Sequence, residues 1–256
     1  RNVLEMFVRF GASSEILYSN KPHIGTDVLM NVVYNIRKYC ESLGAQINFN
    51  HRIDDINISD KKVSSIKVYD IKNDIYFERQ CRQVCLSIGH SARDTFKKLN
   101  ELGVKVAPKN FAVGVRIEHL QKDINIAQYG NKTKLRLGSA DYKLVYHASN
   151  GRTCYTFCMC PGGKVMASNS EESSIVTNGM SNFARDGENA NSALLVNISI
   201  EDFYKESPLD GMYFQEDLEK KAFELGGENY NAPAQRVADF LNGLKTEKFG
   251  KIKPTY

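Results

Sequence analysis

Three cysteines lie in the seven residues from Cys154 to Cys160 and are followed directly by Pro161-Gly162-Gly163. One interpretation is a zinc site completed by His147, although zinc sites usually contain two C-x2–4-C pairs. A second is thiol redox exchange between Cys158 and Cys160. A third is burial of the thiols on one face of a strand, because free cysteine is among the most buried residue types. We take Cys158 and Cys160 as candidate catalytic residues and predict no metal.

Charged and titratable residues also alternate with apolar ones along a predicted strand, Phe111–Glu118. Arg116 would suit an anionic group of a substrate, and His119 could move a proton. The alternative is a strand edge that faces solvent. Tyr129, Tyr142 and Tyr146 are expected to be aromatic residues of a pocket or of the core.

Two loops carry residue types that suit a cofactor. Lys21–Asp27 holds a cation, an imidazole, a glycine and a hydroxyl just before a predicted helix, whose N-terminus favours anions. An ordinary N-cap is the alternative. Gly89–Asp94 follows an apolar run, at the end of a strand where ligands often bind in α/β sheets, and Ser91 would cap the next helix. The alternative is a plain strand–turn–helix connection, and we favour the interpretation as a ligand-binding turn. The candidate cofactor-binding residues are His23, Gly25, Thr26, Ile88, Gly89, His90 and Ser91.

Periodicity predicts the elements that would position these residues. Apolar residues from Leu29 to Leu43 form one helical face that ends at Gly44. A short strand at 46–50 and an antiparallel meander over 53–77 follow. The run 84–89 is almost wholly apolar and ends in glycine, as expected of a buried parallel strand. After a helix at 96–102, strands are predicted at 111–118, 143–147, 153–159 and 193–200, and helices at 215–225 and 233–241.

Composition excludes several classes of protein. The chain has 256 residues, 42% hydrophobic and 25% charged, which is ordinary for a globular protein. The net charge of +4 is scattered, so we expect no nucleic-acid partner. No apolar run is long enough to span a membrane, and residues 1–11 do not resemble a signal peptide. We therefore expect a cytoplasmic protein with reduced thiols and a small-molecule substrate.

The order helix, strand, meander, buried strand resembles the second half of the FAD domain in flavoproteins with two dinucleotide folds, of the glutathione-reductase type. In that group, the residue after the strand that follows the helix contacts the adenine through its backbone. The resemblance assigns this position to Arg52 or Ile53, and places the turn Ser87-Ile88-Gly89-His90 close to the cofactor.

Longer strings are similar to the bacterial "uncharacterised FAD-dependent dehydrogenase" family, and they run nearly from end to end of the chain. They are Lys21–Asp27, Gly89–Asp94, Phe111–His119, Tyr155–Gly163, Thr177–Ser181, Arg185–Gly187 and Asn189–Ala193. The family's proteins are longer at both ends and carry an N-terminal G-x-G-x-x-G loop that holds the pyrophosphate. No such string occurs here, since Phe10-Gly11-Ala12-Ser13-Ser14 has a single glycine.

The resemblance implies an α/β fold: a partial FAD-binding Rossmann-like sheet with an inserted β-rich α+β substrate domain. Residues 1–105 would be the second part of the FAD domain, 106–230 the inserted domain and 231–256 the start of the return. The intact protein would be an FAD-dependent oxidoreductase, with NADH or NADPH as a possible partner, and this chain alone would bind no FAD and be inactive. The alternatives are a non-catalytic ligand-binding module on a flavoprotein fold and a thiol-based redox protein.

Overall fold

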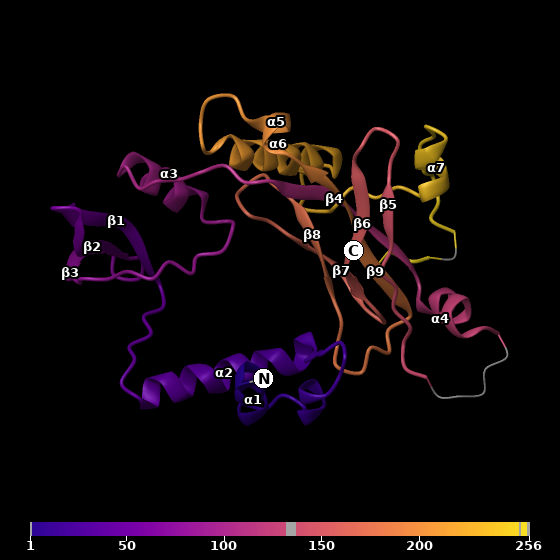
Figure 1. The fold of residues 1–256 in the computed structure, drawn as a ribbon, viewed down its shortest axis with the longest axis horizontal. Coiled ribbons are helices and arrows are strands. Elements are labelled where there is room, and N and C mark those ends of the chain that lie inside the picture. The colour runs from indigo at the N-terminus through magenta and orange to yellow at the C-terminus, as the bar shows by residue number, and fades with distance from the viewer. Residues whose placement is uncertain (1, 132–136, 251, 255–256) are drawn as a thin grey trace. The chain divides into compact units, whose positions relative to one another are not determined.

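The computed structural model describes residues 2–131, 137–250 and 252–254. The chain divides into two compact units, which we describe separately (Figure 1). The larger unit contains residues 1–37 and 108–256, and the smaller unit contains residues 38–107.

A four-stranded antiparallel sheet with the strand order β4-β9-β6-β5 forms the centre of the larger unit. These strands are β4 (Phe111–Leu120), β5 (Val145–His147), β6 (Thr153–Cys160) and β9 (Asn189–Ile198). The four strands predicted from alternation are thus confirmed, although β9 begins four residues earlier than expected. In this register Arg116 lies opposite Ala193, and Ala193 lies opposite Phe157 on the other side.

Shorter elements surround this sheet. The segment between β6 and β9, where we predicted no strand, contains a two-stranded sheet of β7 (Lys164–Ser168) and β8 (Val176–Met180). Helix α4 (Gln121–Tyr129) follows β4, and α5 (Ile200–Phe203) follows β9. The predicted C-terminal helices are α6 (Asp210–Leu225) and α7 (Val237–Leu241).

Aromatic packing attaches α5 and α6 to the sheet. The Phe111 ring of β4 lies 5.1 Å from the Phe203 ring and 6.0 Å from the Phe214 ring, measured between centroids. Figure 1 shows α6 lying beside β4. Gly211 permits this approach, because a β-carbon there would crowd the rings of Phe203 and Phe111.

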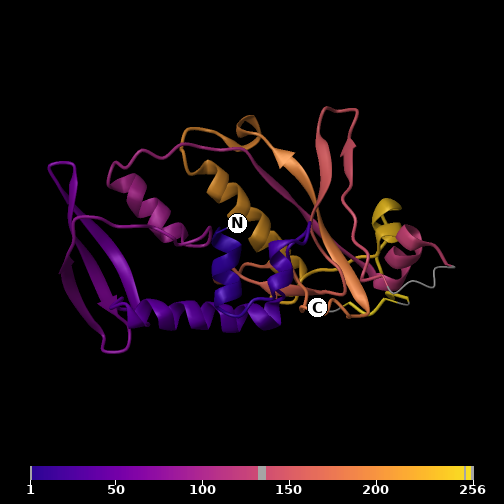
Figure 2. The same cartoon turned by 60° about the horizontal axis from the view of Figure 1, so that its bottom comes forward.

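The first 37 residues form a small helical core. Helix α1 (Asn2–Arg9) and a 3-10 turn, η1 (Ser14–Leu17), pack against the start of α2 (Thr26–Ser42), as Figure 2 shows. Ala12, Ile16 and Val32 are buried at the centre, and Val32 is wholly inaccessible to solvent. The helix predicted over 29–43 is therefore confirmed, and Gly44 follows it with the left-handed φ of 92° that suits glycine.

The smaller unit contains the predicted meander. Strands β1 (His51–Ser59), β2 (Lys62–Asp70) and β3 (Ile75–Gln80) pair in sequence order, all antiparallel. Asp60 and Lys61 have φ values of 50° and 61°, the backbone of a two-residue turn that matches the twist of a hairpin. Helix α3 (Arg93–Glu101) follows and ends just before Gly103, as its pattern predicts.

Two predicted strands of the smaller unit are wrong. Residues 46–50 form no strand, and residues 82–91 contain neither helix nor strand, with Leu86 40% exposed. A parallel strand needs partner strands distant in sequence, and the sheet of this unit is the antiparallel meander. The structure is a mixed α/β fold whose sheets, in the described residues, are antiparallel, so the predicted Rossmann-like sheet is not formed there.

Candidate functional site

Arg116 and its neighbours form a polar cluster on one face of the main sheet. The Arg116 guanidinium donates through Nη1 to the Asn191 side-chain oxygen on β9, and it lies 3.5 Å from the Cys158 carbonyl oxygen on β6. Asn191 is completely buried. Three strands therefore hold the one cationic group of this cluster in place.

The Cys160 thiol belongs to the same cluster, because Cys160 lies opposite Asn191 in the register. Burial raises the pKa of the Cys160 thiol, while the Arg116 cation and the Ser181 hydroxyl act in the opposite direction. Gly179 leaves the space these groups occupy, since a β-carbon there would overlap Arg116, Asn191 and Cys160. The cluster thus joins a cation, a thiol and a buried amide.

A β-bulge separates the two candidate thiols. The pairing of β6 with β9 advances three residues from Phe157 to Cys160 but only two from Ala193 to Asn191. The extra residue allows Cys158 to adopt a left-handed φ of 45°, which costs a residue with a β-carbon roughly 1–3 kcal/mol. Cys158 is exposed and Cys160 is half-buried. The expectation that alternation places both thiols with Cys154 on one face is therefore wrong.

No zinc-type cluster accompanies these cysteines. In the described ranges, no three His, Cys, Asp or Glu side chains gather as metal ligands would. His147, the suggested further ligand, instead lies with Nδ1 3.0 Å from the Thr153 hydroxyl.

His119 lies on the other face of β4 from Arg116, because the two are three residues apart in a regular strand. Its Nε2 is 2.7 Å from the Tyr142 hydroxyl. Burial lowers the pKa of His119 and raises the pKa of Tyr142, so both side chains are neutral near pH 7. The His119 Nδ1 is buried without a hydrogen-bond partner among the described residues. Arg116 and His119, which we predicted to serve one site, therefore lie on opposite faces of the main sheet.

The Lys21–Asp27 loop fastens the start of α2 to the loop after β8. The Thr26 N–H donates to the Ser181 carbonyl oxygen at 3.0 Å, and the Phe183 N–H donates to Asp27 Oδ1 at 2.9 Å. His23 Nε2 lies 3.0 Å from the Asn182 carbonyl oxygen. Gly25 has a φ of 86°, and a β-carbon there would overlap the Phe183 backbone. These contacts are those of a structural attachment.

The Pro161-Gly162-Gly163 turn is hydrogen-bonded to the same loop after β8 and to α4. The Gly162 N–H donates to Gln121 Oε1 at 2.7 Å, and the Gly187 N–H donates to the Gly162 carbonyl oxygen at 3.1 Å. Ser181 Oγ donates to the Pro161 carbonyl oxygen at 2.8 Å. Sequence reasoning assigned no role to Gln121 or Asn191, because a buried amide leaves no periodic signal. For Asn191, the string 189–193 in the family resemblance was the available hint.

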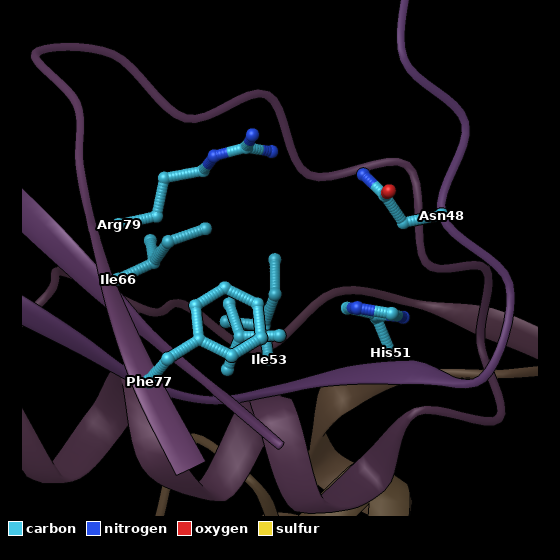
Figure 3. A pocket seen from close by; sticks show the side chains of 7 residues that line it. Asn48, His51, Ile53, Ile66, Phe77 and Arg79 are labelled. Carbon is cyan, nitrogen blue, oxygen red and sulfur yellow. The ribbon is translucent and has the colours of Figure 1, made fainter. Parts of the chain in front are cut away.

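The remaining predicted cofactor residues lie in the smaller unit. Ile53 lines a pocket of about 250 Å³ on the meander, together with Asn48, His51, Ile66, Val68, Phe77 and Arg79. Figure 3 shows Ile53 and Phe77 below, with the polar ends of Arg79 and Asn48 above them. The Arg52 side chain instead pairs with Asp54. Ile88, Gly89, His90 and Ser91 belong to the irregular segment and do not line this pocket, and α3 begins after Ala92 without a side-chain cap, so the cap predicted at Ser91 is wrong.

Comparisons with known proteins identify the larger unit. Residues 110–256, more than half of the chain, match the family described as "FAD-dependent protein, C-terminal domain-like". An "Uncharacterized protein" of Clostridium beijerinckii (strain ATCC 51743 / NCIMB 8052) is 48% identical over 256 residues, covering 99% of this chain and 47% of that protein. The chain thus spans about half the length of this relative. Among the described residues, no helix has the length and apolar character needed to cross a membrane. The chain belongs to the FAD-dependent protein family with this C-terminal domain.

Proposed function

We propose that this chain is the substrate-binding part of an FAD-dependent oxidoreductase of the dehydrogenase class, and that Arg116 holds an anionic group of the substrate. The observation that carries the proposal is the family match, because residues 110–256 contain Arg116, Asn191, Cys160 and Gly179. A cation held by three strands and excluded from bulk water on one side suits a carboxylate or phosphate.

The chemistry of Arg116 favours anion binding over a purely structural role. Both hydrogen bonds described above are donated by Nη1, and the guanidinium fork has five N–H donors, so these two bonds do not use all the donors that an anion could accept from. Asn191 fixes the orientation of the fork from within the core. Flavin, when bound, supplies the hydride acceptor or donor, and this chain would orient the substrate toward it.

The smaller unit has room for only part of an FAD molecule. A pocket of about 250 Å³ lined by Ile53, Phe77 and Arg79 is large enough for one ring system, whereas sites for whole ligands are about 300–1,000 Å³. Its volume would accommodate an adenine, with Phe77 and Ile53 among the residues beside the ring, but not an entire dinucleotide. In the larger unit, the Thr26 amide at the start of α2 bonds Ser181, so it is not offered to a pyrophosphate. We therefore propose that this chain alone does not retain FAD.

His119 stays a candidate for proton transfer on the second face of the sheet, with Tyr142 as its hydrogen-bond partner. A neutral imidazole with one free ring nitrogen can accept or pass a proton. Because this face is separate from that of Arg116, we assign substrate anchoring to Arg116 and do not assign both residues to one pocket.

The test uses the longer Clostridium beijerinckii relative loaded with FAD. A panel of carboxylated and phosphorylated compounds is screened for flavin reduction, with NADH and NADPH as electron donors for the reverse direction. Replacing the residue at the position aligned with Arg116 by glutamine should raise KM at least about tenfold with a smaller change in kcat, and lysine should restore part of the loss. The position aligned with Arg152, which pairs with Asp202 in this chain, is the matched control. An unchanged KM would remove Arg116 from substrate binding. Bound flavin with no turnover would favour the non-catalytic binding module.

A further inference from the structure

The pair Cys158 and Cys160 is not used by the proposed flavin chemistry. Both thiols are free, and a single residue separates the two cysteines in β6. Their surroundings differ. Cys158 is exposed at the bulge, open to small molecules in solvent, and Cys160 is half-buried beside Arg116.

The two cysteines are close enough along the strand for a disulfide. Residues i and i+2 of a strand are separated by about 6.6 Å, within the upper limit of about 6.8 Å between the α-carbons of a disulfide. The bulge and the left-handed backbone at Cys158 interrupt the regular pairing at this point. The Cys160 thiol already donates to the Cys158 carbonyl oxygen at 3.3 Å. The two residues therefore lie in local contact, without the spacing imposed by regular pairing.

Cys160 is the half-buried thiol of the pair and lies next to Cys158. Burial raises the pKa of the Cys160 thiol, and the Arg116 cation and the Ser181 hydroxyl oppose this by favouring the thiolate. Cys154 provides the contrast within the same strand, because it pairs regularly opposite Val196 and stands before the bulge. No other cysteine lies within two residues of Cys154 in the sequence.

We propose that Cys158 and Cys160 are a redox pair that a hydroperoxide oxidises to an intramolecular disulfide. In the first step the Cys158 sulfur attacks the O–O bond, an S–O bond forms, and water or an alcohol leaves with a proton. In the second step the Cys160 sulfur attacks the Cys158 sulfenic acid, the S–S bond forms, the S–O bond breaks and water leaves. The two thiols lose two electrons and two protons, and the hydroperoxide gains them. A dithiol reductant reverses the change.

The experiment treats the 256-residue chain, without flavin, with hydrogen peroxide at increasing times. Remaining thiols are blocked, and the chain is digested without reduction and mapped by mass spectrometry. Trypsin leaves Cys154, Cys158 and Cys160 in one peptide, since no Lys or Arg lies between Thr153 and Gly163. Chymotrypsin cuts after Tyr155 and Phe157 and so separates Cys154 from the pair.

We expect a Cys158–Cys160 disulfide to form several-fold faster than any oxidation of Cys154, and to disappear with dithiothreitol. Cys158→Ser should abolish the disulfide. Cys160→Ser should instead let Cys158 accumulate as a sulfenic acid that a sulfenic-acid-specific reagent traps. Cys154→Ser is the matched control and should change nothing, and circular dichroism checks that each variant is folded.

Oxidation of Cys158 directly to sulfinic acid in the unsubstituted chain, or a disulfide of Cys158 with another cysteine, would overturn the proposal. Equal oxidation of Cys154 and Cys158 would do the same. Because the experiment contains no flavin, these results are independent of whether the flavin assignment holds.

Discussion

The larger and the smaller unit differ in how their candidate sites are assembled. In the larger unit, Arg116, Cys160 and Asn191 come from three strands and meet through antiparallel pairing across long stretches of sequence. In the smaller unit, the pocket lies on a meander of neighbouring strands, and residues 88–91 take no part in it. The first site depends on long-range register, whereas the second depends on local hairpins.

The glycine that anchors the Lys21–Asp27 loop gives the largest expected effect on this comparison. Gly25→Ala would place a β-carbon against the Phe183 backbone at a φ of 86°, so we expect the larger unit to lose at least about 2 kcal/mol of unfolding free energy. Gly44→Ala in the smaller unit is the control. It has a similar φ of 92° with no atom near the added β-carbon, and should cost only about 1 kcal/mol.

Denaturant unfolding of both variants, followed by circular dichroism, measures the difference. Equal losses would show that the contact of the loop with Phe183 contributes nothing, and that the long-range assembly of the larger unit is weaker than we describe.

The same contrast explains what the sequence could predict. The turn at Asp60 and Lys61 joins two strands that are neighbours in the sequence, and the apolar face ending at Gly44 defines a helix without any tertiary partner. Residues 84–89 have the composition of a parallel strand, but composition does not supply the neighbouring strands that such a strand needs. Asn191 and Gln121 were missed because their burial results from pairing that brings distant segments together.

The second prediction concerns the buried His119–Tyr142 pair. Burial lowers the folded-state pKa of His119 below its ordinary value of 6.5, although Asp123 and Glu118 oppose this. The unfolded chain then binds the proton more readily, so this group makes the unfolding free energy fall as pH decreases below about 6.5, until the folded-state pKa is reached.

Chemical unfolding at a series of pH values tests this prediction. His119→Gln should flatten the dependence between about pH 7 and 5. Tyr142→Phe should cost about 1 kcal/mol at every pH through the lost hydrogen bond, while keeping the slope. An unchanged slope of unfolding free energy against pH in the His119→Gln variant would show that other titratable groups cause the pH dependence.

The third and smallest effect concerns the coupling within the Arg116 cluster. The guanidinium favours the Cys160 thiolate, so Arg116→Gln should raise the pKa of this thiol further. Alkylation of Cys160 by iodoacetamide at pH 8 should then slow several-fold, with its pH profile moved to higher pH, and Arg116→Lys should recover part of the rate. Cys85, exposed in the smaller unit, is the internal control and should react at an unchanged rate. An unchanged rate at Cys160 would separate the thiol from the cation.

The most direct measurement of the central claim is the flavin content of the longer Clostridium beijerinckii relative beside that of this chain. Both are purified, mixed with FAD, passed through a desalting column and examined by absorbance and nucleotide extraction. We predict flavin bands in the longer protein and none in this chain, because the pocket of about 250 Å³ lined by Ile53, Phe77 and Arg79 is too small for an entire dinucleotide. Absence of flavin from both proteins would contradict the flavoprotein assignment, and stoichiometric flavin in this chain would contradict the proposal that it does not retain FAD alone.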